Sequence, residues 1–346
     1  MPVKVLVARE LPQAAMEILE RVAALDVHRR DTPLSKWELI ERLPDKDALV
    51  CQLTQRVDAE VLAAAAKLRI VANVAVGYDN IDVAAATARG IAVTNTPGVL
   101  DDTTADFVWA LLLAVARRVV EADRLARSGT WKGWDLLQLL GSDVHRKTLG
   151  LIGFGRIGQR VAARARGFEM RVLYHCRARL SPHTEEDLGV EWAEKDQLLR
   201  ESDFVSLHVP LTAETRHLIS AQELAWMKPS AFLLNTSRGP VVDEDALATA
   251  LVEKRLAGAG LDVFEEEPKV HPRLGTLPNV ALAPHIASAS VETRTRMAVM
   301  AAENVAAVLS GAQTAIRPAR GVGLHARPPN LVNPEVYDLL SAPRGG

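Results

Sequence analysis

Short apolar segments alternate with helical patterns along almost the whole chain of 346 residues. This alternation is typical of βαβ units, in which a parallel sheet carries helices on its faces. It predicts the α/β class. Because a domain commonly has about 150 residues, the length favours two domains over one. We expect both domains to be doubly wound parallel sheets.

The first hundred residues predict one small doubly wound domain of the flavodoxin-like kind. The turn sequence Asn95-Thr96-Pro97-Gly98 ends its pattern, so a domain boundary is expected near residue 97. The expected strands are 3–7, 48–51, 70–73 and 91–93, and the expected helices are 12–24, 58–66 and 83–88.

A second series of apolar segments predicts six strands, which suit a full dinucleotide-binding sheet of the Rossmann type. A further amphipathic helix at 292–309 and a tail rich in proline cannot fold alone. We therefore expect residues 98–289 to form the dinucleotide-binding domain. Residues 1–97 and 290–346 are expected to form a discontinuous substrate-binding domain. The six expected strands are 148–152, 171–174, 204–208, 231–235, 257–261 and 280–283.

Residues 103–127, at the start of the second series, predict one long helix. Its segment 107–116 is apolar on every face, so it must be covered all round. Cover by its own domain together with a second subunit would make the protein a homodimer. A central helix buried within a large monomer is the alternative.

Charge and apolar runs argue against several classes of partner. The 41 Lys and Arg residues nearly balance 43 Asp and Glu residues, and the net charge of −2 supplies no long-range attraction to nucleic acid or an anionic membrane. The longest apolar run, 107–116, is shorter than the roughly 20 residues that cross a bilayer. With Cys51 and Cys176 as its only cysteines and no signal-peptide pattern, the protein is expected to be cytoplasmic. No metal is expected.

The sharpest local motif is Gly153-Phe154-Gly155-Arg156-Ile157-Gly158, which stands directly between an expected strand and an expected helix. Gly153 permits a tight turn, Gly155 lets the backbone approach a pyrophosphate, and Gly158 allows the helix to pack on the strand. The free N–H groups at the helix start would face the phosphates. The motif predicts dinucleotide binding, and a structural glycine-rich turn is the alternative.

The residues after the second strand of this series indicate which dinucleotide binds. NAD-binding domains place an Asp or Glu there, on the ribose 2′-hydroxyl. The stretch Tyr174-His175-Cys176-Arg177-Ala178-Arg179 has no carboxylate, while Arg177 and Arg179 suit a 2′-phosphate. The sequence therefore favours NADP(H), with NAD(H) possible. A solvated charged loop is the alternative.

Three later loops, each directly after an expected strand, carry Arg238, Glu267 and His285. Parallel strands end at one sheet edge, where ligands bind in open α/β folds, so the three side chains are expected at that edge. Taken singly, each has an ordinary structural explanation. Together they amount to an anion anchor, a carboxylate and a proton donor.

With these motifs in this order, the sequence resembles the D-isomer-specific 2-hydroxyacid dehydrogenases, and within them the glyoxylate/hydroxypyruvate reductases. The resemblance covers roughly residues 3–315 and includes 73–82 and the 328–334 tail. It implies that the N–H groups of Val76 and Gly77 bind the substrate carboxylate from the first domain. It also implies cofactor contacts from Thr104, Arg156, Ile157, Val209, Pro210, Thr236 and Asp262.

The reaction expected is reduction of a short 2-oxo acid by NADPH, with glyoxylate giving glycolate or hydroxypyruvate giving D-glycerate. Arg238 would hold the carboxylate and the carbonyl oxygen. His285 would protonate that oxygen as hydride arrives, and Glu267 would orient the imidazole and stabilise its charged form. Substrate is expected to bind between the domains, whose closure would exclude water.

Two positions depart from the family pattern. Gln138 stands in the loop after Trp131, where many of these reductases have an aromatic residue that reaches the partner subunit's pocket, so substrate preference is open. Cys176 stands where Ser is common, and it is either a silent small residue or a thiol that responds to oxidants. Residues 317–327 look like an insertion with no assigned role.

Other functions stay open. A formate dehydrogenase of this fold would have Gln in place of Glu267, and a phosphoglycerate dehydrogenase would have a regulatory domain or an acid after the second strand. Another 2-hydroxyacid dehydrogenase or a phosphonate dehydrogenase would share the triad. The alternative of a different class is a non-catalytic module that senses the dinucleotide. The intact triad and the near-neutral charge weigh against it.

Overall fold

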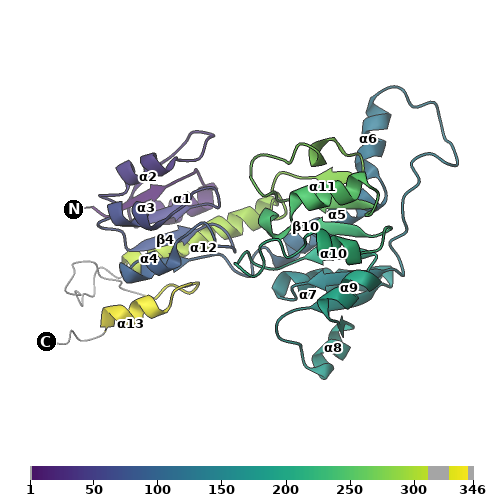
Figure 1. The fold of residues 1–346 in the computed structure, drawn as a ribbon. Helices are drawn as coiled ribbons and strands as arrows, with labels where there is room; N and C mark the ends of the chain where they lie inside the picture. The colour runs from purple at the N-terminus through teal and green to yellow at the C-terminus, as the bar shows by residue number, and fades with distance from the viewer. Residues whose placement is uncertain (1, 311–326, 342–346) are drawn as a thin grey trace. The chain divides into compact units, whose positions relative to one another are not determined.

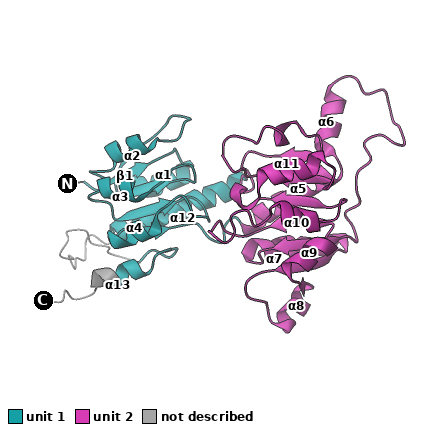
Figure 2. Ribbon diagram, viewed as in Figure 1, with its two compact units in different colours: residues 1–100, 290–346 teal, residues 101–289 magenta. Residues whose placement is uncertain are grey.

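The computed structural model describes residues 2–310 and 327–341, and the chain divides into two compact units (Figure 1, Figure 2). Unit 1 takes residues 1–100 and 290–346, and unit 2 takes residues 101–289. Both are built on parallel sheets, as the alternation of apolar and helical segments predicts. Among the described residues, no helix is long and apolar enough to cross a membrane.

Unit 1 has five parallel strands in the order β2-β1-β3-β4-β5, the doubly wound order of flavodoxin-like folds. They are β1 (Lys4–Val7), β2 (Ala24–Val27), β3 (Ala48–Cys51), β4 (Ile70–Asn73) and β5 (Ala92–Thr94). Every residue of β3, β4 and β5 is buried, because helices cover both faces of the sheet.

The two helical layers of unit 1 come from distant parts of the sequence. One face is covered by α1 (Gln13–Glu20) and α12 (Val291–Ser310), which pack on each other. The opposite face is covered by α2 (Lys36–Arg42), α3 (Ala59–Ala64) and α4 (Val83–Ala88). The helix that follows the second strand series therefore packs on the first sheet.

The described part of the C-terminal tail runs along β5, at the edge of the sheet of unit 1. The N–H of Val332 donates to the carbonyl of Val93 at 2.8 Å, and the side chain of Asn333 accepts the N–H of Val93 at 2.8 Å. Helix α13 (Glu335–Ser341) follows. The tail thus satisfies backbone groups that an edge strand would otherwise expose. Of the expected insertion at 317–327, residues 317–326 lie outside the described residues.

Unit 2 has seven parallel strands in the order β12-β11-β10-β9-β6-β7-β8. They are β6 (Thr148–Ile152), β7 (Arg171–His175), β8 (Glu191–Trp192), β9 (Phe204–Leu207), β10 (Phe232–Asn235), β11 (Gly258–Leu261) and β12 (Val280–Leu282). The expectation of six strands missed β8, because two residues are too short for any periodicity. In unit 1, β2 and α2 were missed as well.

Helices cover both faces of this second sheet (Figure 1). On one face lie α5 (Asp101–Ala116) and α7 (Arg156–Ala165), which pack on each other. On the other face lie α9 (Lys195–Glu201), α10 (Ala221–Trp226) and α11 (Glu244–Val252). Helix α8 (Pro182–Leu188) lies between β7 and β8 in sequence.

The expectation of one helix over residues 103–127 is wrong. Helix α5 ends at Ala116, and α6 (Val119–Arg127) begins after Arg118, whose φ of 53° lies in the left-handed region and interrupts the helix. The 107–116 segment is largely buried by β10, β11 and α7 of its own unit, while Ala110 is exposed. Phe107, Leu113 and Ala114 are half-buried, so cover by the unit itself is incomplete along one face of the helix. The expected dimer stays a prediction.

Candidate active site

The sequence-predicted site residues of unit 2, apart from Thr104, follow the carboxyl ends of strands in its sheet. The sheet is parallel, so these ends share one edge, and the order of the strands reverses between the neighbours β6 and β9. Ligands bind at such a switch point. After β6 come Gly153, Gly155, Arg156, Ile157 and Gly158, and after β7 come Arg177 and Arg179. After β9 come Val209 and Pro210, and after β10 come Thr236 and Arg238. Asp262 and Glu267 come after β11, and His285 comes after β12.

The glycine turn after β6 has the geometry that a dinucleotide phosphate needs. Gly153 has a φ of 90°, and a β-carbon there would lie 2.5 Å from the carbonyl oxygen of His208. A β-carbon on Gly158 would lie 2.6 Å from the oxygen of Gly153, whereas nothing lies within 4 Å of one on Gly155. Helix α7 begins at Arg156 without a side-chain cap, so its first N–H groups can bind an anion. The turn therefore fits the pyrophosphate of a nicotinamide dinucleotide.

Buried polar atoms near this edge also suit a bound polar molecule. Among the described residues, Thr236 Oγ1 and His208 Nε2 have no hydrogen-bond partner, although buried polar atoms normally have one. Burial lowers the pKa of His208 to about 4, so its ring is neutral at pH 7. Thr104, also expected at the cofactor, is buried in the first turns of α5.

The two arginines of the loop after β7 have different surroundings. Arg179 donates from Nε and Nη2 to the two carboxylate oxygens of Glu185, at 2.9 and 2.8 Å. Glu185 is buried and also accepts the hydroxyl of Tyr174 at 2.7 Å. The hydrogen bonds from Arg179 and then Tyr174 hold the pKa of Glu185 below its usual range. Arg177 is exposed. The pKa of Glu214 is lowered first by a hydrogen bond from Thr212 and by its own backbone, and last by the charge of Arg177.

This pairing of Arg179 was not foreseen from the sequence. Glu185 lies six residues after Arg179, outside the stretch 174–179 in which a ribose-binding carboxylate was sought. The thiol of Cys176 in the same loop donates to the carbonyl of Ala178 at 3.0 Å, and burial raises its pKa. A raised pKa means less thiolate, which favours Cys176 as a silent residue over an oxidant-responsive one.

The loop that carries Arg238 packs tightly on the loop that carries Glu267. The side chain of Asn235 shapes the first loop, because its Nδ2 donates to the carbonyl of Arg238 at 2.9 Å. A β-carbon on Gly239 would lie only 1.9 Å from the carbonyl carbon of Phe264. Only glycine allows this approach, which brings Arg238 close enough for its charge to help lower the pKa of Glu267.

His285 and Glu267 form the central pair of the site. Nδ1 of His285 lies 2.9 Å from Oε2 of Glu267, and the two side chains are 29% and 36% exposed. Burial alone would raise the pKa of Glu267, but the hydrogen bond and charge of His285, the N–H of Phe264 and the charge of Arg238 together lower it. An ionised Glu267 can only accept, so Nδ1 of His285 carries a proton, and Nε2 is the atom for proton exchange.

Asp262 has a role that the sequence did not suggest. It is fully buried, and its two carboxylate oxygens accept the N–H groups of Ile286 and Ala287 at 2.7 and 2.8 Å. Burial raises its pKa, although these two hydrogen bonds and the charge of His285 oppose the shift. A buried carboxylate at a strand end needs hydrogen-bond donors from within the protein. An Asp directly after an apolar strand was therefore the sequence feature that could have indicated this role.

Three further residues were expected to bear on the substrate: Val76 and Gly77 in unit 1, and Gln138 in unit 2. Val76 and Gly77 follow β4 in unit 1 and are half-buried. In unit 2, Gln138 accepts the indole N–H of Trp131 at 3.2 Å within an exposed loop.

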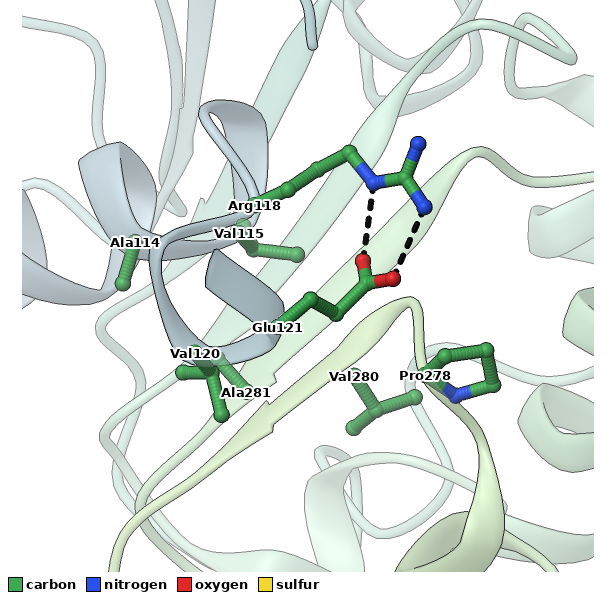
Figure 3. A pocket seen from close by; sticks show the side chains of 8 residues that line it. All are labelled: Ala114, Val115, Arg118, Val120, Glu121, Pro278, Val280 and Ala281. Carbon is green, nitrogen blue, oxygen red and sulfur yellow. Dashed lines mark hydrogen bonds and ion pairs between the residues drawn. The ribbon is translucent and has the colours of Figure 1, made fainter. Parts of the chain in front are cut away.

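The small cavity of Figure 3, beside the ion pair of Arg118 and Glu121, has a volume of about 10 Å³, which is room for about one water molecule. It is too small to hold a substrate.

Comparison with known proteins identifies the family. The model of the D-isomer specific 2-hydroxyacid dehydrogenase, NAD binding domain, matches residues 109–287. A curated glyoxylate reductase of Korarchaeum cryptofilum is 55% identical over 339 residues, which are 97% of this chain and 97% of that protein. A protein of Thermus thermophilus of known crystal structure is 47% identical, with a TM-score of 0.86 over 95% of this chain and all of that one.

A further solved structure is similar and carries ligands. It is an NADPH-dependent glyoxylate/hydroxypyruvate reductase of Sinorhizobium meliloti in complex with NADP and malonate. It is 35% identical, with a TM-score of 0.80 over 90% of this chain and 94% of that one. These matches span both units and agree with the dinucleotide turn and the two parallel sheets. The chain therefore belongs to the D-isomer-specific 2-hydroxyacid dehydrogenase family and is an NAD(P)-dependent dehydrogenase.

Proposed function

We propose that the protein reduces a short 2-oxo acid, glyoxylate or hydroxypyruvate, with hydride from NADPH. The observation that carries this proposal is the pair of His285 and Glu267 beside Arg238, at the sheet edge that also bears the glycine turn. The curated relative from Korarchaeum cryptofilum is named a glyoxylate reductase, which supports the choice of substrate.

The proposed chemistry divides between the cofactor and the side chains. The nicotinamide, when bound, supplies the hydride that reaches the carbonyl carbon. Arg238 binds the substrate carboxylate and the carbonyl oxygen by charge-assisted hydrogen bonds, which orient the carbonyl carbon. His285 donates the Nε2 proton to the carbonyl oxygen, and Glu267 stabilises the imidazolium before this transfer. On unit 1, the N–H groups of Val76 and Gly77 are donors for the substrate carboxylate.

Initial rates with a panel of 2-oxo acids, each with NADPH and with NADH, test this proposal. We expect turnover of glyoxylate and hydroxypyruvate, and His285→Ala should lower kcat by about two to four powers of ten. His183→Ala is the matched control, because His183 lies on the exposed face of α8. Binding of NADPH without turnover of any acid would instead indicate a dinucleotide-sensing module. Oxidation of phosphite with NADP+ or NAD+ as the hydride acceptor, without turnover of any 2-oxo acid, would indicate a phosphonate dehydrogenase.

The preference for NADPH is proposed to rest on Arg177. Arg179 already uses two donors on Glu185, so Arg177 is the guanidinium left to bind a 2′-phosphate. Arg177→Ala should raise the KM for NADPH at least about fivefold, since one charge-assisted hydrogen bond is worth about 1.5–3 kcal/mol. The KM for NADH should stay nearly constant. Arg179→Ala should affect both cofactors alike, because it loosens the loop.

A higher wild-type kcat/KM with NADH than with NADPH would contradict this assignment. So would an Arg177→Ala enzyme that loses both cofactors equally. His175→Asp provides the converse test, because a carboxylate at the end of β7 should improve the use of NADH.

A homodimer is proposed on a different feature from helix α5. The loop after α6 exposes several large apolar side chains, among them Trp134 at 82% and Leu137 at 74%. Exposed apolar groups of this size gathered in one loop are typical of an interface. We expect sedimentation to give a dimer at micromolar concentration and Trp134→Ser with Leu137→Ser to shift it towards monomer. A wild-type monomer near 37.6 kDa would refute the dimer.

A further inference from the structure

Two side-chain amides hold consecutive carbonyl groups in the segment that follows β4 of unit 1. Nδ2 of Asn95 donates to the carbonyl of Val76 at 2.8 Å, and Nδ2 of Asn73 donates to the carbonyl of Gly77, also at 2.8 Å. A hydrogen bond to a carbonyl fixes the plane of its peptide. Each amide therefore sets the direction of one peptide group in the segment proposed to bind carboxylate.

Three consecutive peptide groups of this segment have their carbonyls held by hydrogen bonds, and the N–H of each points to the opposite side. The carbonyl of Ala75 is also held, by the N–H of Thr96 at 2.8 Å. In a trans peptide the N–H points away from the carbonyl of the same unit, so the N–H groups concerned belong to Val76, Gly77 and Tyr78. Within residues 2–310 and 327–341, no hydrogen bond uses any of these three donors. Consecutive N–H groups of this kind can bind an anion.

The amide of Asn73 is itself held firmly. Asn73 is fully buried, and its amide exchanges hydrogen bonds with Asn80 at 3.1 and 3.4 Å. Nδ2 of Asn80 in turn donates to the carbonyls of Gln52 and Gln55 at 3.2 and 3.0 Å. The network leaves Asn73 one orientation for its amide, with Nδ2 towards Gly77.

The C-terminal tail holds Asn95. The N–H of Asn95 donates to the carbonyl of Asn330 at 3.2 Å. Further along the same edge, the N–H of Val332 donates to the carbonyl of Val93. A tail that follows β5 in this way fixes the backbone from which the amide of Asn95 reaches Val76. The side chain of Asn95 thus connects the tail to the carboxylate segment.

We propose that Asn73 and Asn95 are positioning residues for a carboxylate, and that the N–H of Tyr78 joins those of Val76 and Gly77 as a donor to it. The inference rests on the proposed function, in which the carboxylate is that of a 2-oxo acid. It adds a third donor and gives the C-terminal tail a part in substrate binding.

The kinetic test compares Asn95→Ala and Asn95→Asp with the wild type. Asn95→Ala should raise the KM for glyoxylate about five- to tenfold, the worth of one misdirected hydrogen bond, with kcat and the KM for NADPH within about twofold. Asn95→Asp keeps the side-chain volume, loses the donor and adds a negative charge, so its KM should rise further. The matched control is Asn330→Ala, whose side chain contacts Asn304 while its main chain still holds Asn95. It should leave the KM unchanged.

A second measurement keeps the inference separate from the proposed reaction. The backbone amide resonances of Val76, Gly77 and Tyr78 are followed by NMR while oxamate, an unreactive carboxylate analogue of a 2-oxo acid, is added with NADPH present. All three should shift in the wild type, with a weaker apparent affinity in Asn95→Ala. Shifts without turnover of any 2-oxo acid would overturn the proposed function and support this inference. Turnover with an unchanged KM in both variants, or Tyr78 and Gly77 resonances that stay in place, would overturn the inference.

Discussion

The N–H of His285 donates to the main-chain oxygen of Asp262 at 2.8 Å, and the carboxylate of Asp262 binds the two N–H groups that follow His285. His285 has a φ of 55°, in the left-handed region that side chains rarely adopt. Three hydrogen bonds accepted by Asp262 therefore hold His285, the proposed proton donor, in an unfavourable backbone conformation. This arrangement is typical of strain kept at a functional site.

Asp262→Asn should lower kcat by about tenfold or more and the free energy of unfolding by about 1–3 kcal/mol. The amide keeps one acceptor but turns an NH₂ group towards the N–H of Ile286 or Ala287, which leaves that group unpaired. Initial rates and urea unfolding measure the two effects. Asp123→Asn, in the exposed pair with Arg127, is the control and should change neither. An unchanged kcat would show that Asp262 does not position His285.

Glu267→Gln should move the alkaline limb of kcat/KM for reduction to lower pH. In the proposed reaction the imidazolium of His285 gives up a proton, so activity falls at high pH. Glu267 is ionised at neutral pH, because its pKa is lowered, and its charge stabilises the imidazolium. Gln removes that charge, and the proton is then lost sooner. A pH profile that coincides with that of the wild type would refute the role of Glu267.

Gly239→Ala should impair both stability and catalysis. Its β-carbon would lie 1.9 Å from the carbonyl carbon of Phe264, and the backbone must move to relieve this contact. Overpacking costs about 1–3 kcal/mol, and here it would separate Arg238 from Glu267. Gly167→Ala is the matched control, because nothing lies within 4 Å of a β-carbon there. Thermal unfolding and kcat/KM for the 2-oxo acid distinguish the two variants.

His208 should make the protein less stable as the pH falls from 6.5 to 4. The ring titrates at about 4 in the folded protein and at 6.5 when unfolded, so the unfolded chain binds more protons in this window. The loss approaches about 3 kcal/mol at the lower end. His208→Gln removes this contribution, whereas His183→Gln, on the exposed face of α8, should retain it. Parallel pH dependences of unfolding for wild type and His208→Gln would contradict the prediction.

Asn333→Ala should destabilise unit 1 by about 2–4 kcal/mol. The buried side chain of Asn333 accepts the N–H of Val93 and donates to the carbonyl of Ile91 and the hydroxyl of Thr87. Alanine leaves these buried groups unsatisfied, at about 1–3 kcal/mol for each of the stronger ones. Urea unfolding gives the magnitude, with Asn330→Ala expected to cost less than half as much. Equal costs would mean that the tail is held by its backbone alone.

The sequence was sufficient for features that depend on neighbouring residues. Strands β3, β4 and β6 and helix α4 lie at the residues expected, because each is an apolar run or a short helix with polar ends. The glycine turn was recognisable because a positive φ or a close backbone approach restricts the residue at one position to glycine. Strand β8 and the break at Arg118 were not, because two residues carry no period and a left-handed arginine has no sequence signature.

The sequence by itself determined the two α/β series, the dinucleotide turn, and the order in which Arg238, Glu267 and His285 leave their strands. These follow from local apolar patterns and from parallel strands sharing an edge. Only the tertiary structure decided which partner each polar group has: Glu185 for Arg179, two backbone N–H groups for Asp262, and Val76 for Asn95. The physical reason is that such partners lie on different strands and loops, and only packing brings them within hydrogen-bond distance.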